Sequence, residues 1–427
     1  MIDINLLTII LLVSVSALYL LELVKGLLTL KALDPQLPEE FEDVFDQDKY
    51  AKSQAYTREG TRFSLISRTV HFVVFMGFWL LGGFGWWDQF VTGLELGGLW
   101  TGLAFIGGLS VANYLIGLPF AIYDTFSIEA RYGFNRSTVG TFISDQLKAG
   151  LLGIVLGVPF LLLLLWIFRS VPNAWLWAWG ATTVLSLAIS YLAPSLILPL
   201  FNQFEPMPEG ELKESIEDMA AKCDFPLTEV SIVDGSKRSS KSNAYFTGFG
   251  KRKRIALFDT LVENHGTEEL VGVLAHEIGH FKLKHLVQRM LLGIIQSGVI
   301  FYLLGLFTQP AEVGGATDLL CASFGVTEAS VYAGLVFFLI LFKPVEALLS
   351  LFANAWSRKH EFEADAYAAK AQGTPLHLVK ALKKLSADNL SNLTPHPFAV
   401  FLDYSHPPMV QRLAALRSLR LERGQGE

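Results

Sequence analysis

The chain has 427 residues, of which 52% are hydrophobic and only 17% are charged. A soluble globular protein carries about 25% charged residues, and the mean hydropathy of +0.41 is instead typical of a protein that crosses a membrane several times. The formal net charge of −6 argues against nucleic acid as a partner. The two cysteines, Cys223 and Cys321, form neither a disulfide framework nor a cysteine zinc site, and we expect both to be packing residues.

Long apolar segments alternate with charged loops along the chain. The N-terminal segment lacks the basic first region and the cleavage site of a signal peptide, so we predict a retained membrane helix there. A helix needs about 20 apolar residues to cross a bilayer. Seven segments meet this requirement, and they lie near residues 5–25, 66–87, 98–121, 149–168, 174–198, 287–307 and 331–354.

Lys and Arg are distributed unevenly over the loops between these segments. The loops after the first, third and fifth segments and the C-terminal region are rich in basic residues. The loop "WWDQFVTGLELGG" and the loop after the sixth segment contain none. Because basic loops stay on the cytoplasmic side, this alternation predicts that the N-terminus lies outside and that the C-terminus and both regions of soluble character lie inside.

The predicted spans divide the chain into four parts. Residues 1–198 hold five membrane helices, 199–286 form a region of soluble character, 287–354 hold two more membrane helices, and 355–427 form a helical C-terminal region. Within the second part we expect an amphipathic helix, a strand at "EVSIVDG" and a β-hairpin over "NAYFTGFGKRKRIALF" with its turn in "GFGKRK". The expected fold is therefore an all-α polytopic membrane protein with a small α+β insertion.

The stretch "HEIGH" lies on a predicted helix that begins near Thr267, where two acidic residues occupy the first turn. His276 and His280 are four residues apart, so they share one face of the helix and can bind the same metal ion. Glu277 lies about 100° further round the helix and can reach a metal-bound water as general base. The alternative is a solvated helix face that carries two unrelated histidines.

A catalytic zinc ion also needs a third protein ligand and an open fourth position. Glu361 and Asp365 are four residues apart in "SRKHEFEADAYA" and share a helix face. Glu361 can bind the metal while Asp365 accepts a hydrogen bond from a ligand histidine. Two predicted spans separate this helix from the "HEIGH" helix and return the chain to the same side of the membrane. The alternative is an acidic, solvated face.

The motifs "HEIGHFKLKH", "SRKHEFEADAYA", "SNAYFTGF" and "YSHPP", set among seven predicted spans, resemble those of the type I CAAX prenyl endopeptidases. These are integral-membrane zinc metallopeptidases of the a-factor-converting enzyme type. The segments "YAKSQAYTREGTRFS" and "YDTFSIEARYGFNRST" are also similar to segments of that family. The resemblance extends over nearly the whole chain.

The resemblance implies one zinc ion per chain, bound by His276, His280 and Glu361, with Glu277 as the general base. It also implies that the acidic residue after the glutamate ligand, Asp365, supports the site. The family fold encloses a water-filled chamber between its seven helices, with the zinc site inside.

Three further residues match family positions near the substrate. Asn243 matches a residue of an edge strand beside the substrate, and His406 and Arg412 match residues near the zinc that are linked to the oxyanion and to the substrate. Taken alone, Asn243 is also typical of a turn, and His406 of a loop before a Pro-Pro turn. His285, at the end of "HEIGHFKLKH", can make a further polar contact but is more typical of a residue on a helix surface.

These residues predict hydrolysis of a peptide bond. Zinc polarises the scissile carbonyl and acidifies a water molecule, Glu277 transfers the proton to the leaving amine, and His406 or Arg412 can donate to the oxyanion. An exposed strand edge at "NAYFTG" can bind an extended peptide by β-addition. Within the last span, Lys343 and Glu346 are expected to pair and to face the chamber, because charge inside a membrane is costly.

We therefore predict a membrane-embedded zinc endopeptidase in which the α+β insertion is zincin-like. It removes C-terminal residues from prenylated proteins. Its partners are peptide or protein substrates and the lipid bilayer. One alternative is a bacterial quality-control peptidase with the same chemistry, and a bacterial inner membrane is favoured over an endoplasmic reticulum membrane. A second is a transporter or channel with a structural zinc, in which Lys343 and Glu346 form the transport site. A third is an inactive binding protein that keeps the fold.

Overall fold

The protein is described by a computed structural model that covers residues 4–247, 253–308 and 315–419. Within these ranges seven helices are long and apolar enough to cross a membrane, as predicted. They are α1 (Leu6–Lys31), α2 (Gln47–Leu80), α4 (Gly98–Tyr123), α6 (Val139–Ser170), α7 (Ala174–Leu192), α12 (His285–Phe307) and α14 (Val331–Gln372).

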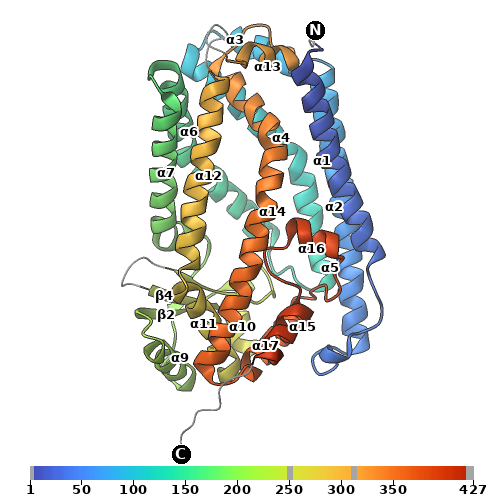
Figure 1. The fold of residues 1–427 in the computed structure, drawn as a ribbon, viewed down its shortest axis with the longest axis vertical. Coiled ribbons are helices and arrows are strands. Elements are labelled where there is room, and N and C mark those ends of the chain that lie inside the picture. The colour runs from blue at the N-terminus through green and yellow to red at the C-terminus, as the bar shows by residue number, and fades with distance from the viewer. Residues whose placement is uncertain (1–3, 248–252, 309–314, 420–427) are drawn as a thin grey trace, which may run out of the picture.

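The long helices run roughly along the long axis of the molecule, and the smaller elements gather at its two ends (Figure 1). The sheet lies at one end with α9 (Glu211–Lys222), α11 (Thr267–Lys282), α15 (Leu376–Asp388) and α17 (Met409–Ser418). The opposite end carries α3 (Gly83–Thr92) and α13 (Thr317–Ser323). The two regions of soluble character, which are far apart in sequence, therefore lie at the same end of the molecule.

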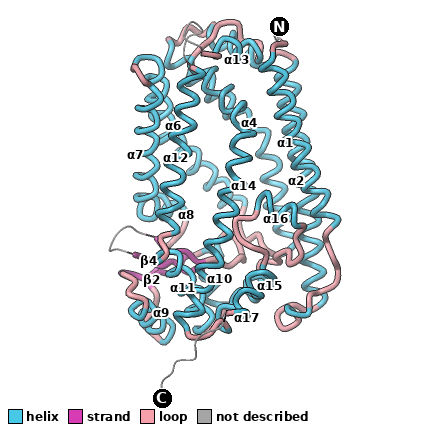
Figure 2. The backbone as a smooth tube through the Cα atoms, viewed as in Figure 1, coloured by secondary structure: helices cyan, strands magenta, loops and turns pink. Residues whose placement is uncertain are grey.

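The described strands form one small mixed sheet in the order β1-β2-β4-β3. Its strands are β1 (Phe204–Pro206), β2 (Leu227–Val233), β3 (Ala244–Thr247) and β4 (Lys253–Phe258). β2 and β4 are parallel, whereas β1 is antiparallel to β2 and β3 is antiparallel to β4. The strands are confined to the end of a molecule that is otherwise helical (Figure 2). β3 is thus an edge strand, and residues 248–252 of the predicted turn "GFGKRK" lie outside the described residues.

Two of the differences between the predicted spans and the observed helices affect the architecture. The predicted second span, 66–87, is interrupted because Gly82 adopts a left-handed conformation with φ of 80°, so α2 ends at Leu80 and α3 begins at Gly83. The predicted last span, 331–354, continues as the single helix α14 to Gln372. The motif "HEFEAD" therefore belongs to the same helix as the last span.

The expected pairing of Lys343 with Glu346 is not observed. Both side chains are exposed, and no ion pair joins them, although both lie in the part of the chain that the structure describes. The two residues are three positions apart on α14.

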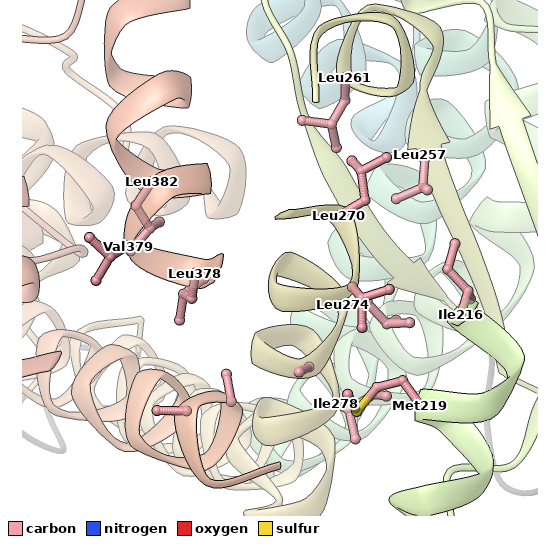
Figure 3. Packing of buried hydrophobic residues seen from close by; sticks show 14 of the residues in the cluster. Ile216, Met219, Leu257, Leu261, Leu270, Leu274, Ile278, Leu378, Val379 and Leu382 are labelled. Carbon is pink, nitrogen blue, oxygen red and sulfur yellow. The ribbon is translucent and has the colours of Figure 1, made fainter. Parts of the chain in front are cut away.

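An apolar face of α11 holds the site region together. Leu270, Leu274 and Ile278 are spaced four residues apart, so they form one stripe along the helix. Figure 3 shows this stripe facing Ile216 and Met219 of α9, with Leu257 of β4 close by and α15 on the other side of α11. Burial of this stripe fixes the direction in which the polar face of α11 points.

The two N-terminal segments that resemble the family meet the loop before β3. Tyr56 of α2 lies 2.8 Å from Lys241 Nζ, and Glu129 at the end of the π-helix η2 (Asp124–Glu129) lies 2.9 Å from the same ammonium group. Tyr56 also donates a hydrogen bond to Glu129. This network connects the membrane helices to the chain that enters the edge strand.

The shorter described elements complete the chain. They are η1 (Glu39–Phe41), α5 (Ala130–Tyr132), η3 (Ala193–Ile197), α8 (Leu198–Phe201), η4 (Gly235–Lys237), α10 (Asp259–Asn264) and α16 (Pro397–Asp403).

Candidate active site

The close crossing of α11 and α14 forms the base of the site. Gly279 lies at the crossing, where an added Cβ would be 3.1 Å from both Cα and the carbonyl oxygen of Ala364. Only glycine allows the two backbones to approach this closely without a displacement. The crossing brings the histidines of α11 against the carboxylates of α14.

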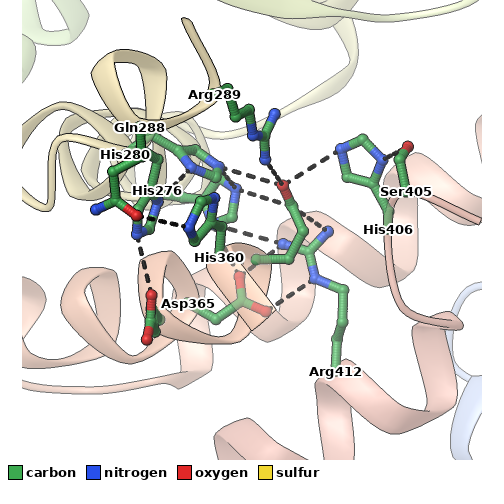
Figure 4. Close-up of polar contacts among 12 residues, drawn as sticks. His276, His280, Gln288, Arg289, His360, Asp365, Ser405, His406 and Arg412 are labelled. Atoms are coloured by element: carbon green, nitrogen blue, oxygen red, sulfur yellow. Dashed lines mark hydrogen bonds and ion pairs between the residues drawn. The ribbon is translucent and has the colours of Figure 1, made fainter. Parts of the chain in front are cut away.

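The possible ligand atoms of His276, His280 and Glu361 all lie within 4.8 Å of one another, and Figure 4 shows the rings of His276 and His280 side by side. His276 Nε2 lies 3.2 Å from His280 Nε2 and 3.4 Å from Glu361 Oε2. His280 Nε2 lies 3.3 Å from Glu361 Oε1. Ligand atoms about 2.1 Å from one tetrahedral ion are about 3.4 Å apart, so the three side chains are spaced as ligands of one metal ion.

The chemistry of these atoms also fits a cation. Glu361 is 2% exposed, and its Oε2 atom is buried without a hydrogen-bond partner among the described residues. A buried carboxylate oxygen of this kind is costly unless a cation or a donor satisfies it. Two imidazole nitrogens and one carboxylate are a ligand set of catalytic zinc sites. The three residues can therefore hold a metal ion.

Asp365 contacts His276, and Arg412 in turn contacts Asp365. Asp365 Oδ1 lies 2.8 Å from His276 Nδ1, so it can accept a hydrogen bond from the ring nitrogen that does not face the metal position. The Arg412 guanidinium binds both oxygens of Asp365, at 2.8 and 2.6 Å. Arg412 is itself buried, with Nη1 3.6 Å from Glu361. Two of its five N–H donors are thus directed to Asp365.

Burial and neighbouring groups shift the pKa values of His276 and Glu277. Burial lowers the pKa of His276, but the hydrogen bonds with Asp365 and Glu361 outweigh this effect and raise the pKa to about 9 in the metal-free chain. Burial raises the pKa of the Glu277 carboxyl above its ordinary value of 4.5. A carboxyl whose pKa is raised towards neutrality is better suited to proton transfer than an exposed one.

A cavity of about 210 Å³ lies beside the metal position. Its lining includes Glu277, Asn243, His406 and Arg412. Asn243 is exposed immediately before β3, and its Oδ1 accepts a hydrogen bond from the Ala244 backbone N–H at 2.9 Å. All the residues predicted near the substrate are therefore next to the predicted ligands.

His406 approaches the site from the loop before α17. Its Nε2 lies 3.5 Å from Glu361 Oε1, while its Nδ1 lies 3.0 Å from the Ser405 hydroxyl. If the hydroxyl donates to Nδ1, the ring proton is on Nε2 and points towards the cavity. The side chain is 63% exposed, so it remains accessible to a ligand.

Three neighbours of the site were not identified as such from the sequence. His285 was expected on a helix surface, but it is buried, with Nδ1 2.9 Å from His280 Nδ1. Glu363 lies 3.1 Å from the other ring nitrogen of His285, and Arg289 lies 3.8 Å from Glu361. These contacts join positions up to 78 residues apart, and spacing along a single helix does not reveal them.

Comparisons with known families agree with this architecture. Residues 27–203 match the family described as CAAX prenyl protease N-terminal, five membrane helices. Residues 206–420 match peptidase family M48. Together with the seven helices and the convergent His, His and Glu side chains, these matches define an integral-membrane metallopeptidase.

Curated relatives and a solved structure identify the family more closely. The chain is 38% identical to the CAAX prenyl protease 1 homolog of Oryza sativa, over 90% of each chain. It is 34% identical to CAAX prenyl protease 1 of Saccharomyces cerevisiae, over 90% of this chain and 89% of the yeast protein. The crystal structure of S. mikatae Ste24p is similar with a TM-score of 0.87 and 33% identity, over 96% of this chain and 99% of that chain. The chain belongs to the CAAX prenyl protease family of M48 metallopeptidases.

Proposed function

We propose that the protein is a zinc endopeptidase that removes C-terminal residues from prenylated proteins, with one zinc ion bound by His276, His280 and Glu361. The convergence of these three side chains beside Glu277 is the observation that carries the proposal. The prenylated substrate is proposed from the relatives, whose names describe CAAX prenyl proteases.

We assign each residue of the cavity its own role in hydrolysis. A zinc ion held by the three ligands would supply Lewis-acid polarisation and an acidified water. Glu277 takes a proton from the attacking water and gives it to the leaving amine. His406 Nε2–H donates a hydrogen bond to the carbonyl oxygen as negative charge develops on it. Asp365 holds the ring of His276, and Arg412 holds Asp365.

The edge strand β3 gives the substrate a place to bind. Its partner β4 covers only one side, and no described strand pairs with the other side. An extended peptide can add to this free edge through backbone hydrogen bonds. Asn243, at the start of the edge and in the wall of the cavity, would donate from its side-chain amide to a substrate carbonyl. We propose that the rest of the peptide and its lipid enter a chamber between the membrane helices.

We further propose that the sheet and the zinc site lie on the cytoplasmic side, because the loops at that end are rich in Lys and Arg. The preference for a bacterial inner membrane stays a prediction that the relatives do not support, since those named above are eukaryotic.

The test uses purified full-length protein in detergent and a quenched-fluorescent peptide that ends in a farnesylated CAAX sequence. Glu277→Gln removes the proposed base but keeps the size of the side chain, so we expect cleavage to fall by at least about 100-fold while bound zinc is unchanged. Glu268→Gln, on an exposed residue of the same helix, is the matched control and should cleave normally.

Each result has a distinct meaning. Zinc-dependent cleavage by the wild type and by Glu268→Gln, with loss in Glu277→Gln, supports the proposed mechanism. Retained cleavage by Glu277→Gln would refute the role of Glu277. Equal cleavage of the peptide without its farnesyl group would refute the requirement for a prenylated substrate.

A further inference from the structure

A second group of polar side chains lies directly behind the metal ligands. His285 is the first residue of α12, and His360 and Glu363 lie on α14. Both histidines are 1% exposed. The chemistry described above uses none of the three, although burial of two imidazoles is costly unless they are hydrogen-bonded.

These residues are close enough to suggest a second metal site, but their geometry disfavours one. The rings of His285 and His360 are stacked, with centroids 3.9 Å apart and planes inclined by 7°. Lone pairs lie in the plane of an imidazole ring, so those of two stacked parallel rings cannot converge on one ion. Both nitrogens of His285 are also engaged already, with His280 and with Glu363.

The positions of the nitrogens define which of them carry protons. His280 Nε2 is the atom that faces His276 and Glu361, and a nitrogen that binds a metal carries no proton. The proton of neutral His280 is therefore on Nδ1, which donates to His285 Nδ1 at 2.9 Å. That atom must be the acceptor, so the proton of His285 is on Nε2 and is donated to Glu363 Oε2 at 3.1 Å.

The two ligand histidines are thus supported in different ways. His276 contacts the carboxylate of Asp365 directly. His280 reaches the carboxylate of Glu363 only through the ring of His285. A carboxylate or another acceptor behind a ligand histidine fixes the orientation of the ring and increases its basicity towards the metal.

We propose that His285 is a positioning residue, and that the series Glu363–His285–His280 orients His280 for metal binding. The proposal rests on the proposed zinc site. His285 does not touch the substrate or the metal, and it acts only through the ring of His280.

The test measures the affinity of the metal-free, full-length protein for Zn²⁺ in detergent, by competition with a chelating dye. His285→Phe keeps a planar ring but removes the acceptor for His280 Nδ1–H, and we expect the zinc dissociation constant to rise by about 10–100-fold. His285→Asn keeps an acceptor close to the backbone and should restore most of the affinity. Glu363→Gln keeps an acceptor without the charge and should give a smaller loss than His285→Phe.

His360→Phe is the matched control, because it keeps a ring stacked on His285 and leaves the hydrogen bonds of His285 intact. We expect it to bind one zinc with the wild-type dissociation constant. Absorption of the Co²⁺-substituted proteins gives a second readout, since a reoriented His280 changes the ligand-field bands of His285→Phe but not those of His360→Phe. Thermal unfolding of each metal-free variant shows whether it is folded.

The outcomes separate this proposal from the zinc site itself. Wild-type affinity in folded His285→Phe would overturn the proposal, and so would an equal loss in His285→Phe and His285→Asn. A second zinc in the wild type that both His285→Phe and His360→Phe lose would overturn it in favour of a second metal site. Absence of zinc binding by the wild-type protein would refute the zinc site proposed above, together with any role for His285 at it.

Discussion

Asp365 and Arg412 form an ion pair that is buried beside His276. Asp365→Asn would leave the Arg412 guanidinium buried with a weaker partner, and breaking a buried pair costs about 3–5 kcal/mol. We expect the free energy of unfolding of the metal-free protein to fall by that order, measured by denaturant unfolding in detergent. Zinc affinity should fall as well, because His276 loses a charged acceptor.

A double replacement distinguishes loss of an ion pair from loss of two independent contacts. Asp365→Leu combined with Arg412→Met removes both charges together, so neither member of the pair stays buried without the other. The loss of unfolding free energy in the double variant should be smaller than the sum of the losses in the two single variants. If the loss of unfolding free energy in the double variant equals the sum of the losses in the two single variants, the two side chains contribute to stability separately.

The pKa of His276 leads to a prediction about proton release. In the metal-free chain the carboxylates of Asp365 and Glu361 outweigh burial and raise this pKa to about 9, so at pH 7 the ring is protonated. A zinc ligand must be neutral, so zinc binding at pH 7 should release about one proton. As the pH rises through this pKa, the proton released by His276 should disappear, because the ring is then already neutral before zinc binds.

Calorimetry measures this proton directly. Zinc is titrated into the Glu277→Gln variant in buffers of different ionisation enthalpy, because this variant has no carboxyl at the position of the base that could contribute a proton. A binding enthalpy at pH 7 that does not depend on the buffer would contradict the assignment of a protonated His276.

At the scale of the element, the free edge of β3 predicts a defect in substrate binding. Asn243→Asp keeps the oxygen that accepts from the Ala244 N–H, but it replaces the side-chain amide that would donate to the substrate. Loss of one such hydrogen bond costs about 1–3 kcal/mol, so kcat/KM for the farnesylated peptide should fall by roughly tenfold or more, mainly through KM. Bound zinc should not change. A fall in kcat at constant KM would instead place Asn243 at the reacting bond.

Elements defined by local pattern could be predicted, and those defined by distant contacts could not. The hairpin of β3 and β4 and the helix α11 follow from residues close together in sequence. β1 was not predicted, because its three residues become a strand only through pairing with β2. The close approach of α11 and α14 at Gly279 and the contact of His285 with Glu363 depend on a crossing between helices far apart in the chain. For the same reason, the individual residues of the site were easier to predict than its supporting contacts.

At the scale of the whole molecule, the arrangement of the seven spans can be tested by labelling. Helices that cross a bilayer place the two ends of their bundle on opposite sides of it. Figure 1 shows the loop after α3 at one end and α9 at the other. Leu94, after α3, and Lys222, at the end of α9, are both exposed.

We expect a cysteine at these two positions to react from opposite sides of the membrane. The background is Cys223→Ala with Cys321→Ala, which removes both natural thiols, and the probe is a membrane-impermeant maleimide added to sealed bacterial spheroplasts that express the protein. Leu94→Cys should react at once, whereas Lys222→Cys should react only after the membrane is permeabilised. The reverse pattern would place the zinc site outside and contradict the orientation that the loop charges predict. Reaction of both positions before permeabilisation would show that the two ends do not lie on opposite sides, and the seven helices would then not all cross the bilayer.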